Sequence, residues 1–174
     1  FLNLLPLPSC STTDATTPND ATCWCVGTTI CNRGMLCDAS TSNSPCSVTI
    51  SSFAHETSGS FTMSVSSQLS QMIVVAQGDT FTLTGDETSS DDLYQLVGPA
   101  GTPTRDSPKR HFKSTGVLTL RYVWLSKGSV VSSDEACNKE TFIDLEPCFG
   151  GSLFVAGVGS KLIASHLFVG ADKI

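Results

Sequence analysis

Two stretches of the chain carry the same pattern, Leu118-Thr-Leu-Arg-Tyr-Val-Trp-Leu125 and Leu162-Ile-Ala-Ser-His-Leu-Phe-Val169. In both, small or apolar residues occupy the first, third, sixth and eighth places. A spacing of two is typical of a β-strand, whose side chains alternate between faces, and the single step of three predicts a corner between two strands. Recurrence of this unit predicts a coiled sheet in which each turn packs on the next. A pair of hairpins in a β-sandwich is the alternative.

Length and composition favour an all-β protein with a small attached module. The chain has 174 residues, of which only 15% are charged, and its formal net charge is −6. This charge, without a long basic run, argues against a nucleic-acid partner. No apolar stretch approaches the roughly 18–20 residues that cross a bilayer, so we expect no membrane insertion.

Eight cysteines, six of them before residue 47, indicate an oxidising compartment. The chain starts at Phe1, and a cleaved secretory signal would explain both facts, so we predict an extracellular or cell-surface protein. Metal binding is the alternative use of these cysteines, but the paired Cys-x-x-Cys motifs or neighbouring histidines of zinc sites are missing. We predict three disulfides, in a pairing that sequence does not define, among Cys10, Cys23, Cys25, Cys31, Cys37 and Cys46.

We divide the chain into an apolar N-terminal arm, residues 1–9, a disulfide-rich module, residues 10–46, and a β domain, residues 47–174. The arm has no partner of its own, so we expect it to pair as an edge strand with this chain or with a neighbouring copy. The Ser/Thr-rich segment that follows contains a candidate O-glycosylation tract of four residues, Thr12, Thr13, Thr16 and Thr17.

A series of further motifs continues along the β domain. They are Ile73-Val-Val-Ala-Gln-Gly-Asp-Thr-Phe-Thr-Leu83, Leu96-Val-Gly-Pro99, Gly116 to Leu125, Gly150-Gly-Ser-Leu-Phe-Val155 and Ser160-Lys-Leu162. In this order they resemble the pectin-lyase-like right-handed β-helices of surface and secreted proteins, including polymorphic outer-membrane adhesins. The resemblance implies a short right-handed parallel β-helix of three to four coils, each of about 22–26 residues. Residues 132–149 would then be an insertion, which we expect a disulfide between Cys137 and Cys148 to close.

The disulfide-rich module has a resemblance of its own. The motifs Cys23-Trp-Cys25 and Gly34-Met-Leu-Cys37-Asp-Ala-Ser40 are similar to the short Cys-rich repeats of secreted proteins from unicellular eukaryotes. The chain departs from that pattern at Val26, which separates Cys25 from the following glycine.

Catalytic constellations of the resembled fold are not visible in the sequence. Pectate lyases of that fold use an arginine beside aspartate-bound calcium, and polygalacturonases use aspartates on successive coils. Here Asp86, Glu87, Asp91 and Asp92 share one turn, which we interpret as solvated, with a calcium site as the alternative. No histidine lies beside a cysteine or acid that would activate a nucleophile, and we interpret His166 as the corner residue equivalent to Tyr122. We predict no enzyme activity, no metal site and no cofactor.

Two features of the β domain suggest how the protein is used. Trp124 and Phe168 hold equivalent outward places, which suits sugar stacking or a partner surface unless another segment covers them. A coil end left open would bind another copy, and head-to-tail stacking generates a filament because it does not close.

We therefore predict a secreted structural protein, the subunit of an extracellular fibre or surface coat. It would be a homopolymer assembled head-to-tail through β-helix ends and the N-terminal arm, with eight contact residues, Phe1, Leu2, Leu4, Leu5, Leu7, Leu167, Val169 and Ile174. The alternative is a monomeric adhesin or glycan-binding module that uses the face of Trp124 and Phe168.

Overall fold

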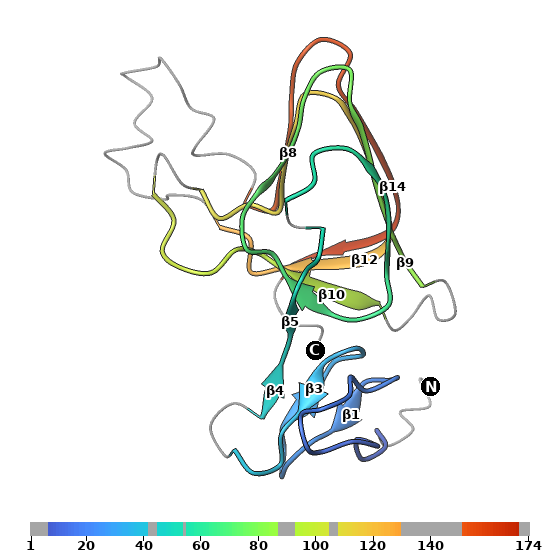
Figure 1. The fold of residues 1–174 in the computed structure, drawn as a ribbon, viewed down its shortest axis with the longest axis vertical. Coiled ribbons are helices and arrows are strands. Elements are labelled where there is room, and N and C mark those ends of the chain that lie inside the picture. Colours follow the sequence, from blue (N-terminus) through green and yellow to red (C-terminus); the bar gives the residue numbers. More distant parts are fainter. Residues whose placement is uncertain are drawn as a thin grey trace, which may run out of the picture.

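The computed structural model describes residues 7–41, 45–53, 55–86, 93–104, 108–129 and 151–170, and in these ranges it contains strands and no helix. Figure 1 shows a small module, coloured blue, beneath a larger body of strands. The module consists of two antiparallel strand pairs. These pairs are β1 (Cys23–Trp24) with β2 (Ile30–Cys31) and β3 (Leu36–Cys37) with β4 (Cys46–Ser47).

The larger body is organised by a seven-stranded sheet in which every pairing is parallel. Six strands follow one another in a half-barrel, in the order β5, β7, β10, β12, β9 and β6, and β14 also pairs with β12. Their bounds are β5 (Thr49–Ile50), β6 (Gly59–Met63), β7 (Ser67–Gln68), β9 (Thr80–Gly85), β10 (Tyr94–Val97), β12 (Val117–Ser126) and β14 (Lys161–Val169).

The long strand β12 has two neighbours on one side and one on the other. Its first half pairs with β9, its second half pairs with β10, and β14 follows it along both halves. The strand serves both neighbours because it bends at Tyr122, which has a φ of 53°. His166 bends β14 at the same place with a φ of 48°, and its ring stacks on that of Tyr122 at a centroid distance of 4.5 Å. The predicted corner is therefore confirmed, with His166 equivalent to Tyr122.

A second, three-stranded sheet closes the open side of the half-barrel. It is also parallel, in the order β13 (Leu153–Val155), β11 (Phe112–Ser114) and β8 (Ile73–Val75). Figure 1 shows β8 opposite β9 and β14, with β10 and β12 along the third side. The hydrophobic core fills the space between the sheets and includes a row of aromatic rings, spaced 5.1–5.7 Å apart, from Phe53, Phe61, Phe81 and Phe112.

The prediction of a short right-handed parallel β-helix of three to four coils is wrong. The protein is all-β, but its main sheet is a half-barrel of parallel strands in which β12 is shared between β9 and β10. The spacing of paired strands is also not uniform, because Gly59 and Phe81 are 22 residues apart, whereas Phe81 and Leu118 are 37 apart and Leu118 and Leu162 are 44 apart. What the repeat did predict correctly is the pairing of its two copies, since Leu118–Leu125 and Leu162–Val169 align residue by residue.

The disulfide-rich module is fixed to the sheet through Arg33. This side chain lies 4.3 Å from the ring centre of Tyr94 and forms an ion pair of 3.6 Å with Asp86. The backbone carbonyl of Arg33 accepts a hydrogen bond from the hydroxyl of Ser66, and the amide of Ser66 donates to the carbonyl of Gly34 at 3.1 Å. The predicted insertion at 132–149, with Cys137 and Cys148, lies outside the described residues.

We expect the bend at Tyr122 to tolerate no side chain on the neighbouring Gly85. An added Cβ there would collide with the carbonyl oxygen of Tyr122, so Gly85→Ala should lower the free energy of unfolding by about 3 kcal/mol. Urea unfolding measures the loss. The matched control is Gly170→Ala, where a Cβ first meets the Phe168 ring at 3.4 Å and the expected change is below about 0.5 kcal/mol. Equal unfolding midpoints for the two variants would contradict the close contact.

Candidate functional site

The strand β14 forms an exposed edge of the main sheet. Within the described ranges it pairs with β12 and with no other strand. Leu162 is 41% exposed and Val169 is 48% exposed, whereas their register partners in β12, Leu118 and Leu125, are completely buried. The apolar positions that are buried in β12 are therefore partly exposed in β14, because within the described residues no further strand lies beside it.

Local sequence explains why β14 starts where it does. Gly157 and Gly159 both have a positive φ, 114° and 84°, which glycine adopts without a steric penalty. The hydroxyl of Ser160 donates to the carbonyl of Gly157 at 2.8 Å and closes this turn. The chain then runs extended from Lys161, whose amide donates to the carbonyl of Gly116 at 3.0 Å. The turn thus delivers β14 in register with β12.

Open sheet edges attract further strands, and proteins block them with prolines, charges or covering segments. Between Lys161 and Val169 there is no proline, and the charged residue is Lys161 at the start of the strand. An extended edge with exposed apolar side chains can therefore accept a strand through main-chain hydrogen bonds and bury its side chains against it.

The residues predicted for self-assembly fall into three groups. Val169 lies on the exposed edge, and Leu167 is half-buried against the core. Leu7 is 36% exposed, and the chain directly after it pairs with β1, since the amide of Trp24 donates to the carbonyl of Pro8 at 2.8 Å. The remaining five, Phe1, Leu2, Leu4, Leu5 and Ile174, lie outside the described residues.

Sequence reasoning missed Leu162, which is a third large exposed apolar residue of the strand beside Phe168 and Val169. Its equivalence to the buried Leu118 was the signal that could have found it. Also missed was the opposite end of the sheet, where Ile50 in β5 is 62% exposed. No motif marks this two-residue strand.

The two aromatic residues proposed to bind glycans, Trp124 and Phe168, do not both lie on the surface. Trp124 and Phe168 are register partners, and their rings meet edge-on at 5.9 Å. Trp124 is only 1% exposed, because Phe168 lies on one side of it and Gln95 on the other. Gln95 in turn accepts a hydrogen bond from Asn32 of the module at 3.3 Å. Phe168 is 38% exposed. The pair therefore offers one ring edge and no flat ladder for stacking sugars.

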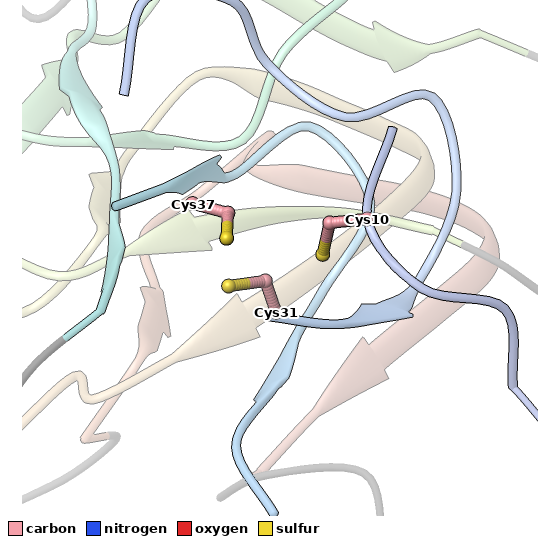
Figure 2. Close-up of side chains that lie close together, drawn as sticks. All are labelled: Cys10, Cys31 and Cys37. Carbon is pink, nitrogen blue, oxygen red and sulfur yellow. The ribbon is translucent and has the colours of Figure 1, made fainter. Parts of the chain in front are cut away.

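The six described cysteines form three disulfides, Cys10–Cys23, Cys25–Cys37 and Cys31–Cys46. Figure 2 shows Cys10, Cys31 and Cys37 pointing toward one another, and their sulfur atoms lie within 4.8 Å. Each of these sulfurs belongs to a different disulfide, so none is the thiolate that a metal requires. The cluster is instead the core of the module, and it indicates an oxidising compartment.

The predicted O-glycosylation tract is an ordered loop held by Asn19, which is 2% exposed. Its side-chain oxygen accepts a hydrogen bond from the amide of Thr12, and its amide nitrogen donates to the carbonyl of Thr12, both at 3.2 Å. The hydroxyls of Thr12 and Thr16 donate to Thr17 and Asp14 at 2.8 and 2.7 Å. Thr13, Thr16 and Thr17 are exposed and Thr12 is half-buried.

A polar cleft of about 450 Å³ separates the module from the sheet. Its polar lining includes the amide side chains of Asn32, Gln68 and Gln95, together with Lys127. The amides are engaged within the protein, because Gln95 donates to the hydroxyl of Ser126 at 2.6 Å and Gln68 donates to the carbonyl of Gly98 at 3.4 Å. These contacts assign the cleft no particular ligand.

Comparison with known protein families, with characterised proteins and with solved structures finds no match to the chain. The resemblance to pectin-lyase-like proteins therefore stays a prediction. Over the ranges that the structure describes, we find no helix with the length and apolar character needed to cross a membrane.

One buried histidine, His111, carries a strongly shifted pKa. Its side chain is completely buried, and its Nε2 lies 2.8 Å from the carbonyl oxygen of Leu96. Burial lowers the pKa of His111 from 6.5 to about 4, and the hydrogen bond to the backbone carbonyl of Leu96 opposes this shift. The imidazole is therefore neutral in the folded protein at neutral pH.

We expect this histidine to make the fold acid-sensitive. Between pH 6.5 and 4 the unfolded chain binds a proton at His111 that the folded protein does not, so stability is full above pH 6.5 and falls as the pH decreases. The loss at pH 4 should approach about 3 kcal/mol. Urea unfolding of His111→Gln should show a correspondingly smaller loss between pH 7 and pH 4, and His55→Gln, at an exposed position, is the control. An unchanged pH dependence in His111→Gln would contradict the assignment.

Proposed function

We propose that the protein is a secreted structural protein, the subunit of an extracellular fibre or surface coat, and that it polymerises through the β14 edge. The observation that carries this proposal is an extended strand with exposed Leu162, Phe168 and Val169 and without a second strand partner in the described part of the chain. Adding a strand to this edge would satisfy backbone groups and remove apolar side chains from water at the same time.

The disulfide-rich module supports the extracellular part of the proposal. Three disulfides cross-link about forty residues that have little other apolar core, which suits a protein exposed to conditions outside the cell. Their convergence on Cys10, Cys31 and Cys37 holds the module together as one unit. The N-terminal arm, as a second contact between subunits, remains a prediction that rests on the apolar residues of 1–9.

We do not propose the alternative function, a monomeric adhesin or glycan-binding module. It depends on a flat aromatic face at Trp124 and Phe168, and the Trp124 ring is 1% exposed. The observed edge-on contact leaves no surface on which a sugar ring could stack on both residues.

The test is polymerisation of the oxidised protein with its native disulfides, followed by light scattering and electron microscopy. Leu162→Lys combined with Val169→Lys places charges on the edge, which opposes strand addition, so the concentration needed for polymerisation should rise at least about ten-fold. Circular dichroism and the unfolding midpoint confirm that the variant is folded.

The matched control is Val158→Lys, because Val158 is 91% exposed but lies in the turn before β14. It adds the same kind of charge near the same strand and should polymerise like the unchanged protein. The proposal is overturned if the unchanged protein remains monomeric at all concentrations, or if the double variant polymerises as readily as the control.

A further inference from the structure

The two ends of the main sheet can be compared strand by strand. Along the part of β12 that precedes Tyr122, the strands lie in the order β6, β9, β12 and β14. Along the part of β12 that follows Tyr122, the strands lie in the order β5, β7, β10, β12 and β14. One end of the sheet is therefore β14 alone, and the other end is β6 together with β5. Both ends present two limbs, which are the two halves of β14 at one end and the separate strands β6 and β5 at the other.

At equivalent register positions, a small residue at one end of the sheet corresponds to a large residue at the other end. Gly59 of β6 aligns, through Phe81 and Leu118, with Leu162 of β14. Two residues further along, Phe61 of β6 aligns in the same way with Ala164. If the β14 edge of one copy met the β6 edge of the next, Leu162 would face a glycine and Ala164 would face a phenylalanine. Large side chains would thus meet small ones at both positions.

The second limb shows the same relation. Thr49 of β5 aligns through Ser67, Leu96 and Leu125 with Val169. The next position carries Ile50, which is 62% exposed, at the β5 end and Gly170 at the β14 end. A large exposed side chain would again meet a glycine.

The bend also has a counterpart. His166, at the bend of β14, is exposed on the side away from Tyr122. At the other end, a hollow of about 150 Å³ lies between β5 and the end of β6, with Ile50, Met63 and Val65 in its lining. Met63 aligns with Gly85, which contacts Tyr122, so the hollow occupies the position that the next layer's corner residue would face.

Charges at the two ends are complementary as well. Lys161 starts β14 and aligns through Val117 and Thr80 with Ser58, the residue before β6. Glu56 lies two residues earlier and is exposed, as is Lys161. Residues 57 and 58 form a bend, so register does not fix the contact, but the two ends carry opposite charges close to the same position.

We propose that the occupant of the β14 edge is a second copy of this chain, whose β6 and β5 add to β14 in parallel with Gly59 opposite Leu162. This inference rests on the proposed function, since it assumes that the edge mediates polymerisation, and it names the partner surface and the register. The interface is heterologous, so each added copy presents a new β14 edge and the assembly grows as an open filament. Neighbouring strands at each junction lie about 4.8 Å apart, as within the sheet.

An engineered charge pair at Thr62 and Ser165 tests the register. These two residues align through Thr84 and Arg121, both are exposed, and at the proposed junction Ser165 of one copy lies beside Thr62 of the next. Two variants share Ser165→Glu and differ only at position 62, where one has Thr62→Glu and the other Thr62→Lys. Since Ser165 neighbours Arg121 within the chain, the shared glutamate is equally accommodated in both.

Like charges directly opposite each other on adjacent strands oppose pairing, and opposite charges favour it. We expect the variant with T62E and S165E to need about ten times more protein for polymerisation than the variant with T62K and S165E. The difference should shrink in about 0.5 M salt, where the Debye length falls to roughly 4 Å and exposed charge pairs are screened. The single variants T62E and T62K show whether either residue alone alters folding.

The outcomes of these experiments separate this inference from the proposed function. Polymerisation that is blocked by Leu162→Lys with Val169→Lys, but is equal in the two charge variants, would overturn the register and retain the edge. A particle mass of two copies that does not increase with concentration would overturn the open stack in favour of a closed pair of β14 edges. An unchanged protein that stays monomeric would overturn both proposals.

Discussion

The bend of β12 at Tyr122 is the constraint on which the rest of the sheet depends. A straight strand of that length would have one neighbour on each side, but the bend lets β12 pair with β9 before it and β10 after it. The left-handed backbone at Tyr122 is costly for a residue with a side chain, and stacking against His166, which has the same backbone conformation, accompanies it. Both limbs of the half-barrel, and thus the core between them, follow from this one residue.

The core and the module are stabilised in different ways. Between the sheets, aromatic and aliphatic side chains such as Phe81, Phe112 and Leu120 are completely buried, and burial of apolar surface is the main stabilising term. The module has too few such residues, and three disulfides together with the buried Asn19 replace the missing core. Arg33 then joins the two parts, because it contacts both Tyr94 and Asp86.

Local sequence predicted which segments of the β domain form strands better than it predicted which strands pair with one another. Alternation at Leu118–Leu125 and Leu162–Val169 identified the strands, their corner and their mutual pairing, because each of these depends on residues close in sequence or on a direct repeat. The closure of the sheet was predicted wrongly. Whether β12 faces one strand or two is decided by β9 and β10, which lie far away in the chain and carry no motif that reports their shared neighbour.

In the candidate site, too, features set by local sequence were predicted and features set by distant segments were not. The sequence pointed to Leu167 and Val169 as contact residues, and in the structure they lie on the open strand β14 together with the exposed Leu162. The sequence placed Trp124 on an outward face, but alternation does not reveal that Gln95, which accepts a hydrogen bond from Asn32, lies beside it. The disulfide pairing was equally beyond reach, because spacing along the chain does not determine which cysteines meet in space.

The position of β14 in the order of the chain has a consequence for biosynthesis. It is the last strand described, and it pairs with β12, which in turn pairs with β9 and β10. All these pairings join residues distant in sequence, so they form late compared with local structure. Until β14 has been made, β12 is the open edge of the sheet, and Leu118 and Leu125 lack the strand that lies beside them in the complete fold. Such an unpaired strand edge, exposed while the chain is incomplete, is a common hazard for parallel sheets during synthesis.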